Sequence, residues 1–236
     1  MGQITVVRHG QASFLQDDYD KLSALGELQA RKLGEYWLAR GVRFDRVYYG
    51  PARRQSGTGE IVRDCYAKAG APWPEPVCMP DFDEYPGIEV MRAFLPDLIE
   101  KHEDIRLLET EFRTAGEHRV AARAFEKMFQ RVTRMWVAGE VESPDVETWG
   151  SFCDRVEAGV GKVRANGGSA VVFTSGGVMA ATVRIALDLS PQRTLELSWA
   201  PRNGAYAEFL FSGDRFSIVT FNVHPHLDSP EWLTWR

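Results

Sequence analysis

The stretch that decides the fold is Ile4-Thr5-Val6-Val7-Arg8-His9-Gly10-Gln11. Its β-branched residues are typical of a buried strand. The strand runs into an arginine, a histidine and a glycine, and the first two side chains suit a strand end better than a strand core. In an open parallel α/β sheet, ligands bind at the carboxyl ends of the strands, which is where Arg8 and His9 fall. The segment therefore predicts an imidazole beside a fixed cation at one edge of a sheet, although the tripeptide alone is a weak signal.

The composition restricts the class of protein. The chain has 236 residues, of which 44% are hydrophobic and 26% charged, as expected for one large α/β domain. Its net charge is −5 and its longest basic tract is Pro51-Ala52-Arg53-Arg54, so nucleic acid is not an expected partner. We see no apolar run near the roughly 18 residues that a membrane span needs, and no signal-peptide pattern. The widely spaced Cys65, Cys78 and Cys153 predict reduced thiols in a cytoplasmic protein.

Apolar periodicity and turn residues predict strands that alternate with helices. Besides the first strand, we expect strands at residues 44–49, 77–79 and 169–174, and a terminal hairpin at 205–211 and 216–221. Helices are expected at residues 24–40, where Ser23 is the N-cap, and at 52–69, 148–166 and 178–187.

The interval 88–144 interrupts this alternation. It contains two amphipathic stretches, residues 88–102 and 117–138, with no strand signal between them. We therefore expect a single domain over residues 1–236, built as a three-layer α/β/α sandwich with a mostly parallel sheet. Residues 88–144 are expected to form a helical insertion over the active cleft, and Tyr85 and Phe14 to line its approach with apolar surface.

Four predicted strand ends bring chemically useful residues to one edge of the sheet. The first carries Arg8 and His9, the second leads to Arg54, the third to Glu84, and the fourth to Ser175 and a Gly-Gly turn into the helix expected at residues 178–187. Two arginines and a helix N-terminus suit the three free oxygens of a phosphate group. Neighbouring cations favour the neutral, nucleophilic form of an imidazole. A carboxylic acid at Glu84 would protonate a leaving oxygen and later activate water.

Several of these assignments have alternatives. Arg53 is an alternative to Arg54 as the phosphate-binding arginine, and the sequence spacing from Pro51 favours Arg54. Asp81 and Asp83 compete with Glu84, which the spacing from Phe82 favours. Ser175 is equally well explained as a turn residue before two glycines.

The two C-terminal histidines leave a further question open. The segment His224-Pro225-His226 has no cluster of cysteines or carboxylates with it, so a metal site is not expected there. One of its imidazoles folding back toward His9 is a weak alternative.

Taken together, the ordered motifs resemble the histidine phosphatase superfamily, the phosphoglycerate mutase-like fold. The resemblance covers residues 3 to about 223 and is carried by Val7-Arg8-His9-Gly10-Gln11, by residues 22–30 and 51–58, by Phe82-Asp83-Glu84, and by Thr174-Ser175-Gly176-Gly177. It implies that His9 is the phosphorylated nucleophile and Glu84 the proton donor. It also implies that Arg8, Arg54, Ser175 and Gly176 bind the phosphate.

One departure from the family affects the expected activity. Members usually carry a second histidine in a Ser-His-Gly-Gly turn, and this chain has Ser175 in that slot. A hydroxyl still donates a hydrogen bond but brings no charge, and losing one such stabilising group costs on the order of 10²–10³ in rate. We thus expect weakened or re-tuned catalysis.

The expected activity is hydrolysis of a small phosphorylated substrate by a phosphatase of the histidine acid phosphatase type, through a phosphohistidine on His9. This chemistry requires no metal and no organic cofactor. Mutase-type phosphoryl transfer and phosphate binding with little turnover remain alternatives. No membrane partner is expected, and a dimer is compatible with the sequence.

Overall fold

The computed structural model describes residues 1–13 and 20–235, so Phe14 lies outside the described residues. The chain divides into two compact units, Met1–Glu84 with Cys153–Arg236, and Tyr85–Phe152. The interval 88–144 falls within the second unit. Its place as an insertion over the active cleft of a single domain stays a prediction.

In the first unit, six strands of the described chain form one sheet in the order β3-β2-β4-β1-β5-β6. They are β1 (Gly2–Arg8), β2 (Arg46–Tyr49), β3 (Pro76–Cys78), β4 (Ser169–Thr174), β5 (Tyr206–Ser212) and β6 (Arg215–Val223). The first four are parallel, while β5 is antiparallel to β1 and β6 to β5. Arg8 pairs with Thr174 and Tyr49 with Phe173, so three parallel strands end level with one another. The expected mostly parallel sheet is confirmed, and the carboxyl ends of its parallel strands lie at one edge.

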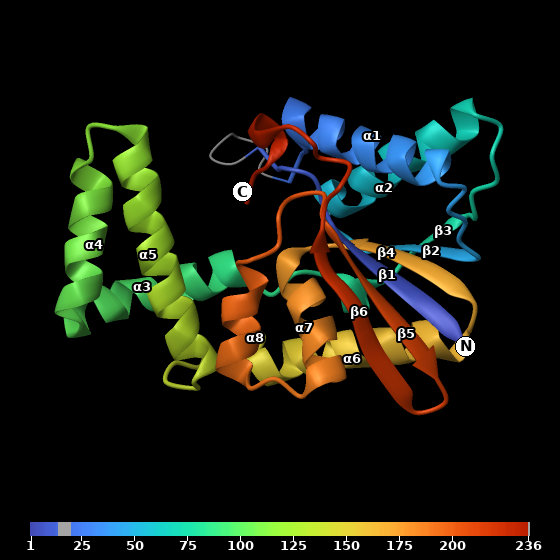
Figure 1. Cartoon of the computed structure of the whole chain (residues 1–236). Helices are drawn as coiled ribbons and strands as arrows, with labels where there is room; N and C mark the ends of the chain where they lie inside the picture. Colours follow the sequence, from blue (N-terminus) through green and yellow to red (C-terminus); the bar gives the residue numbers. More distant parts are fainter. Residues whose placement is uncertain (14–19, 236) are drawn as a thin grey trace. The chain divides into compact units, whose positions relative to one another are not determined.

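Helices cover both faces of this sheet (Figure 1). On one face lie α1 (Ala24–Ala39) and α2 (Arg53–Lys68), and on the other α6 (Trp149–Ala165), α7 (Gly176–Leu187) and α8 (Pro191–Ser198). Ser23 caps α1 as expected, since its hydroxyl accepts the Gly26 N–H at 3.1 Å. The layers match the predicted α/β/α sandwich, but α8 was not predicted. Its start has an ordinary signal, because Ser190 caps it and Pro191 is its first residue.

The start of α7 differs from the prediction in a way that matters for the site. The helix begins at Gly176, two residues before the expected Val178, because both glycines adopt helical conformation. Its N-terminal N–H groups therefore follow Ser175 directly. An added Cβ at Gly176 would lie 2.7 Å from the Ser198 carbonyl oxygen, so the close approach of backbone there requires glycine.

Aromatic and β-branched side chains fill the core on the α1–α2 face of the sheet. Trp37 of α1 packs edge-on against Tyr206, with ring centroids 5.6 Å apart, and Tyr66 of α2 packs against Trp73 at 4.7 Å. Val47, Val171 and Phe173 of the sheet complete this cluster. A strand register shifted by one residue would expose these side chains, so the core fixes the level of the strand ends.

The second unit is helical, with α3 (Gly87–Lys101), α4 (Glu103–Thr114) and α5 (His118–Val137). The helix α4 was not predicted. Its sequence is highly charged, and among its residues only Ile105 is buried. Tyr85 was expected to line an approach to the site, but it is buried and packs against Trp136, Trp149 and Phe152. These contacts lie within the second unit. The expected lining of the approach by Tyr85 stays a prediction.

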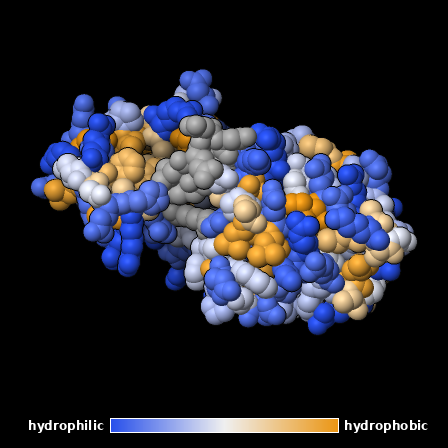
Figure 2. Space-filling model, turned by 90° about the horizontal axis from the view of Figure 1, so that it is seen from above, coloured by the Kyte–Doolittle hydropathy of each residue, from blue (hydrophilic) through white to orange (hydrophobic). Residues whose placement is uncertain are grey.

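On the face shown in Figure 2, hydrophilic residues predominate and hydrophobic ones occur in separate groups. Among the helices of the described chain, none has the length and apolar character needed to cross a membrane. Cys65, Cys78 and Cys153 are free.

Candidate active site

His9 lies immediately after β1 and is held on both sides. Its backbone N–H donates to the Thr174 carbonyl at 2.8 Å, which ties it to the end of β4. Its Nδ1 lies 2.7 Å from the Gly10 carbonyl oxygen, and because a carbonyl only accepts, Nδ1 carries the proton. The side chain is 7% exposed. Burial, followed by the charges of Arg54 and Arg8, holds the pKa of His9 well below its usual value, so the imidazole is neutral.

The second ring nitrogen of His9 faces Arg54, which lies in the first turn of α2. Arg54 Nε donates to His9 Nε2 at 3.2 Å, consistent with a lone pair on Nε2. The Arg54 Nη1 atom donates to Asp20 Oδ1 at 2.6 Å, and Asp20 Oδ2 accepts the Arg53 N–H at 2.8 Å. Of the two arginines that the sequence leaves in competition, Arg54 is the one that contacts His9. Asp20 was not singled out from the sequence.

Arg8 contacts residues 230–235, which we call the C-terminal segment. Its Nη1 donates to the Pro201 carbonyl and its Nη2 to the Trp235 carbonyl, the latter at 2.6 Å. The segment is fixed by Gln29, whose Nε2 donates to the Trp232 carbonyl at 2.7 Å and to the Thr234 hydroxyl at 3.0 Å. Each terminal nitrogen of the Arg8 guanidinium, which was expected to bind phosphate, thus donates one hydrogen bond to a backbone carbonyl.

The N-terminus of α7 brings Glu84 and Ser175 together. Glu84 Oε2 accepts the Gly177 N–H in the first turn of α7 at 3.1 Å. The competing carboxylates have other partners: Asp81 forms an ion pair with Lys162 at 2.7 Å, and Asp83 Oδ1 accepts the Glu84 N–H at 2.8 Å. Glu84 is therefore the carboxylate of this group that reaches the end of β4.

Ser175 is 1% exposed and makes its hydrogen bond with Gln55, which is fully buried. Gln55 Oε1 accepts the Ala52 N–H at 3.1 Å, so the orientation of the amide is fixed by a group that only donates. Gln55 Nε2 then donates to Ser175 Oγ at 2.8 Å and to the Phe82 carbonyl at 3.3 Å. Because Ser175 Oγ accepts, its own hydrogen points elsewhere. The Ser175 hydroxyl makes no capping bond to α7.

Some of the predicted site residues contact one another directly, and others are related only through a shared helix. His9 and Arg54 are in direct contact, while Glu84 and Ser175 meet at α7. Arg8 lies beside Gly176, since an added Cβ there would be 3.6 Å from Arg8 Nε. Asp20 and Gln55 contribute contacts that no sequence pattern indicated, because their partners lie 34 and 120 residues away.

The C-terminal histidines do not fold back onto His9. His226 is buried, stacks against Tyr206 with centroids 6.3 Å apart, and has no hydrogen-bond partner for either nitrogen in the described chain. Burial lowers the pKa of His226 to about 4. His224 Nδ1 lies 2.7 Å from the Asn222 carbonyl oxygen. Within residues 1–13 and 20–235, no group of three or more His, Cys, Asp or Glu residues is arranged to hold a metal ion.

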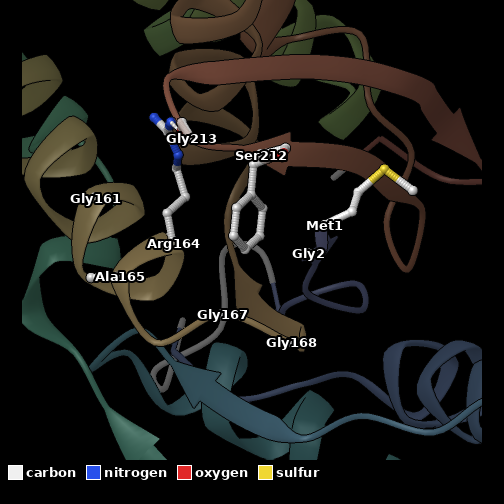
Figure 3. A pocket seen from close by; sticks show the side chains of 10 residues that line it. Met1, Gly2, Gly161, Arg164, Ala165, Gly167, Gly168, Ser212 and Gly213 are labelled. Carbon is white, nitrogen blue, oxygen red and sulfur yellow. Dashed lines mark hydrogen bonds between the residues drawn. The ribbon is translucent and has the colours of Figure 1, made fainter.

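A cavity of about 450 Å³ lies at the other end of the sheet, where β1 and β4 begin (Figure 3). Glycines make up much of its lining, and Arg164 is its cation. The Arg164 guanidinium donates to the Gly213 carbonyl at 2.7 Å and lies over the Phe216 ring, so it holds the β5–β6 turn. This cavity contains none of the predicted site residues.

Comparison with solved structures places the fold. Bacillus stearothermophilus YhfR superposes with a TM-score of 0.64 at 16% identity, covering 97% of this chain and all of that one. A mycobacterial glucosyl-3-phosphoglycerate phosphatase in complex with inorganic phosphate gives 0.61 at 18% identity, with coverage of 96% and 99%. Phosphoglycerate mutase from Bacillus anthracis gives 0.61 at 14% identity, with coverage of 96% and 95%. At these identities the likeness concerns the fold.

A comparison with curated protein sequences finds no match. The family model of the histidine phosphatase superfamily, branch 1, matches residues 90–224, more than half of the 236 residues. The matched range does not include His9, Arg54 or Glu84. Because the match covers more than half of the chain, the chain belongs to the histidine phosphatase superfamily.

Proposed function

We propose that the protein hydrolyses a small phosphate monoester through a phosphohistidine on His9. The observation that carries this proposal is the hydrogen bonding of the imidazole: Nδ1 lies 2.7 Å from the Gly10 carbonyl and Nε2 accepts from Arg54 at 3.2 Å. That pattern leaves a neutral ring with its lone pair beside a guanidinium. A neutral nitrogen next to a phosphate-binding cation is what nucleophilic attack on phosphorus requires.

In the first step, His9 Nε2 attacks the phosphorus atom and the bond to the ester oxygen breaks. Glu84, as a carboxylic acid, gives its proton to the departing oxygen. In the second step, the Glu84 carboxylate takes a proton from water as the water oxygen attacks phosphorus. The P–N bond breaks, inorganic phosphate leaves, and His9 and Glu84 return to their starting forms.

The phosphate oxygens are assigned to Arg54, Arg8, Ser175 and the Gly176 N–H. Arginine holds such oxygens in fixed geometry, and the first N–H groups of a helix attract anions. The hydroxyl hydrogen of Ser175 is suited to donate, because the Gln55 amide makes Ser175 Oγ an acceptor. To reach the phosphate, Arg8 exchanges the Trp235 carbonyl for a phosphate oxygen.

The test is a burst experiment with an aryl phosphate labelled on phosphorus. We expect wild type to form an acid-labile phosphoryl adduct on His9 and to turn over, and His9→Ala to do neither. His118→Ala, which removes an exposed histidine, is the matched control and keeps wild-type behaviour. Equal turnover by wild type and His9→Ala above background would refute the assignment. An adduct that forms and does not hydrolyse indicates a phosphate-binding protein, and a requirement for a bisphosphate primer indicates a mutase.

A further inference from the structure

We propose that Asp20 is a positioning residue that holds the Arg54 guanidinium in place against Nε2 of His9. The inference rests on the proposed function, because it gives Arg54 the task of meeting the phosphoryl group on that nitrogen. It adds to the site a residue whose own carboxylate does not touch the reacting atoms.

The carboxylate of Asp20 is fixed through both oxygens. Oδ1 accepts from Arg54 Nη1 at 2.6 Å, and Oδ2 accepts the N–H of Arg53, the first residue of α2, at 2.8 Å. A carboxylate at the start of a helix is favoured by the helix dipole, and α2 is a helix of 16 residues. The Asp20 side chain is 35% exposed and that of Arg54 only 14%, so the ion pair is partly shielded from water.

Because the Arg54 guanidinium is planar and rigid, its contact with Asp20 helps to fix the orientation of the whole group relative to His9. Arg54 is held at Nη1 by Asp20 and at Nε by His9, and these two atoms lie on different edges of one rigid plane. Because the Nε–H bond points at His9 Nε2, the edge formed by Nε and Nη2 faces His9. A phosphoryl group on Nε2 would meet that edge, which is the geometry of two-point recognition of phosphate by arginine.

A purely structural role is the competing explanation, since Asp20 also accepts a hydrogen bond from the first N–H of α2. The two roles make different predictions for Asp20→Asn. Asn has one acceptor oxygen where Asp has two, so it cannot keep both contacts in their present positions, one at each end of the side chain. If Asp20 positions Arg54, the contact between Arg54 and His9 changes; if Asp20 only supports the helix, stability changes alone.

The experiment combines a kinetic double-variant cycle with ¹⁵N NMR of His9. We expect Asp20→Asn to lower kcat/KM for an aryl phosphate by about 10- to 100-fold, the range for a misplaced catalytic contact. In an Arg54→Lys background the same change has little further effect, since Lys lacks the planar fork. The Nε2 resonance of His9 moves in Asp20→Asn as the Arg54 hydrogen bond is lost.

Asp45→Asn is the matched control, because Asp45 Oδ2 accepts the Ser169 N–H at 2.8 Å at the opposite end of the sheet. It leaves kcat/KM and the His9 resonance unchanged. An unmoved resonance in Asp20→Asn, or equal losses in the Arg54 and Arg54→Lys backgrounds, overturns the inference. Absence of any turnover in wild type refutes the proposed function instead, and the NMR comparison still decides the role of Asp20.

Discussion

Ser175→His introduces the histidine that the resemblance implies at this position, and the structure predicts that this change alone fails. Ser175 is 1% exposed and its oxygen lies 2.8 Å from the amide of Gln55, which has no exposed surface. An imidazole at position 175 therefore needs the volume that the Gln55 side chain fills.

The cost follows from packing and hydrogen bonding. Forcing a larger side chain into a filled core costs about 1–3 kcal/mol, and each hydrogen bond lost by the displaced Gln55 amide adds about 1 kcal/mol. For a chain of 236 residues, a loss of about 2–4 kcal/mol lowers the melting temperature by roughly 5–15 °C. Turnover of the single variant stays at or below that of wild type.

The double variant Ser175→His with Gln55→Ala removes the obstruction. We expect its melting temperature to recover in part and its turnover of an aryl phosphate to rise above wild type, by up to about 10²-fold if one charge-stabilising donor is regained. Thermal denaturation and steady-state kinetics measure both effects, with Ser217→His on the exposed face of β6 as the control. Faster turnover and an unchanged melting temperature in the single variant would refute the reasoning.

Three further predictions concern other parts of the first unit. Glu84→Gln should lower kcat by about 10²–10⁴-fold on an alkyl phosphate and less on an aryl phosphate with an acidic leaving group, because general acid catalysis matters most for poor leaving groups; equal losses on both substrates would contradict the role. His226→Phe tests a pH effect: the lowered pKa, about 4 against an ordinary 6.5, means that the unfolded chain binds a proton between these values and the folded chain does not. Wild-type stability should thus fall as pH drops from 6.5 to 4, by about 3 kcal/mol from this residue, and the variant should lose that part of the slope in urea denaturation. Truncation after Ser229 leaves the buried Gln29 amide without its two acceptors in the C-terminal segment and should lower the unfolding free energy by about 1–3 kcal/mol. The same truncation frees Arg8 from the Trp235 carbonyl, so calorimetry should detect tighter binding of inorganic phosphate; unchanged affinity would argue against a competing role for that carbonyl.

The sheet and the residues at its strand ends were predictable from local sequence. β-Branched runs such as Ala170-Val171-Val172-Phe173 identify buried strands, and the rule that ligands meet the carboxyl ends of parallel strands brings His9 and Arg54 together. The contact between them, at 3.2 Å, follows from topology that the periodicity of the sequence already implies.

The remainder depends on tertiary contacts that no local pattern encodes. Asp20 looks like one more loop carboxylate until α2 brings the Arg53 N–H to it. Gln55 looks like a helix residue until the end of β4 presents Ser175. The helix α4 was missed for a related reason: with only Ile105 buried, its stability comes from neighbouring helices more than from its own apolar pattern.

The hydrogen bond from Arg54 to Nε2 of His9 has a consequence for chemical selectivity. While it persists, the lone pair of the imidazole is masked, and an electrophile without a phosphoryl group has nothing with which to draw the guanidinium aside. On the proposed function, a phosphorylated substrate offers the arginine a better partner and so exposes the nitrogen that we propose attacks it. The resting site would then react slowly with general acylating reagents, and discrimination in favour of phosphoryl donors would begin before any bond to phosphorus is made.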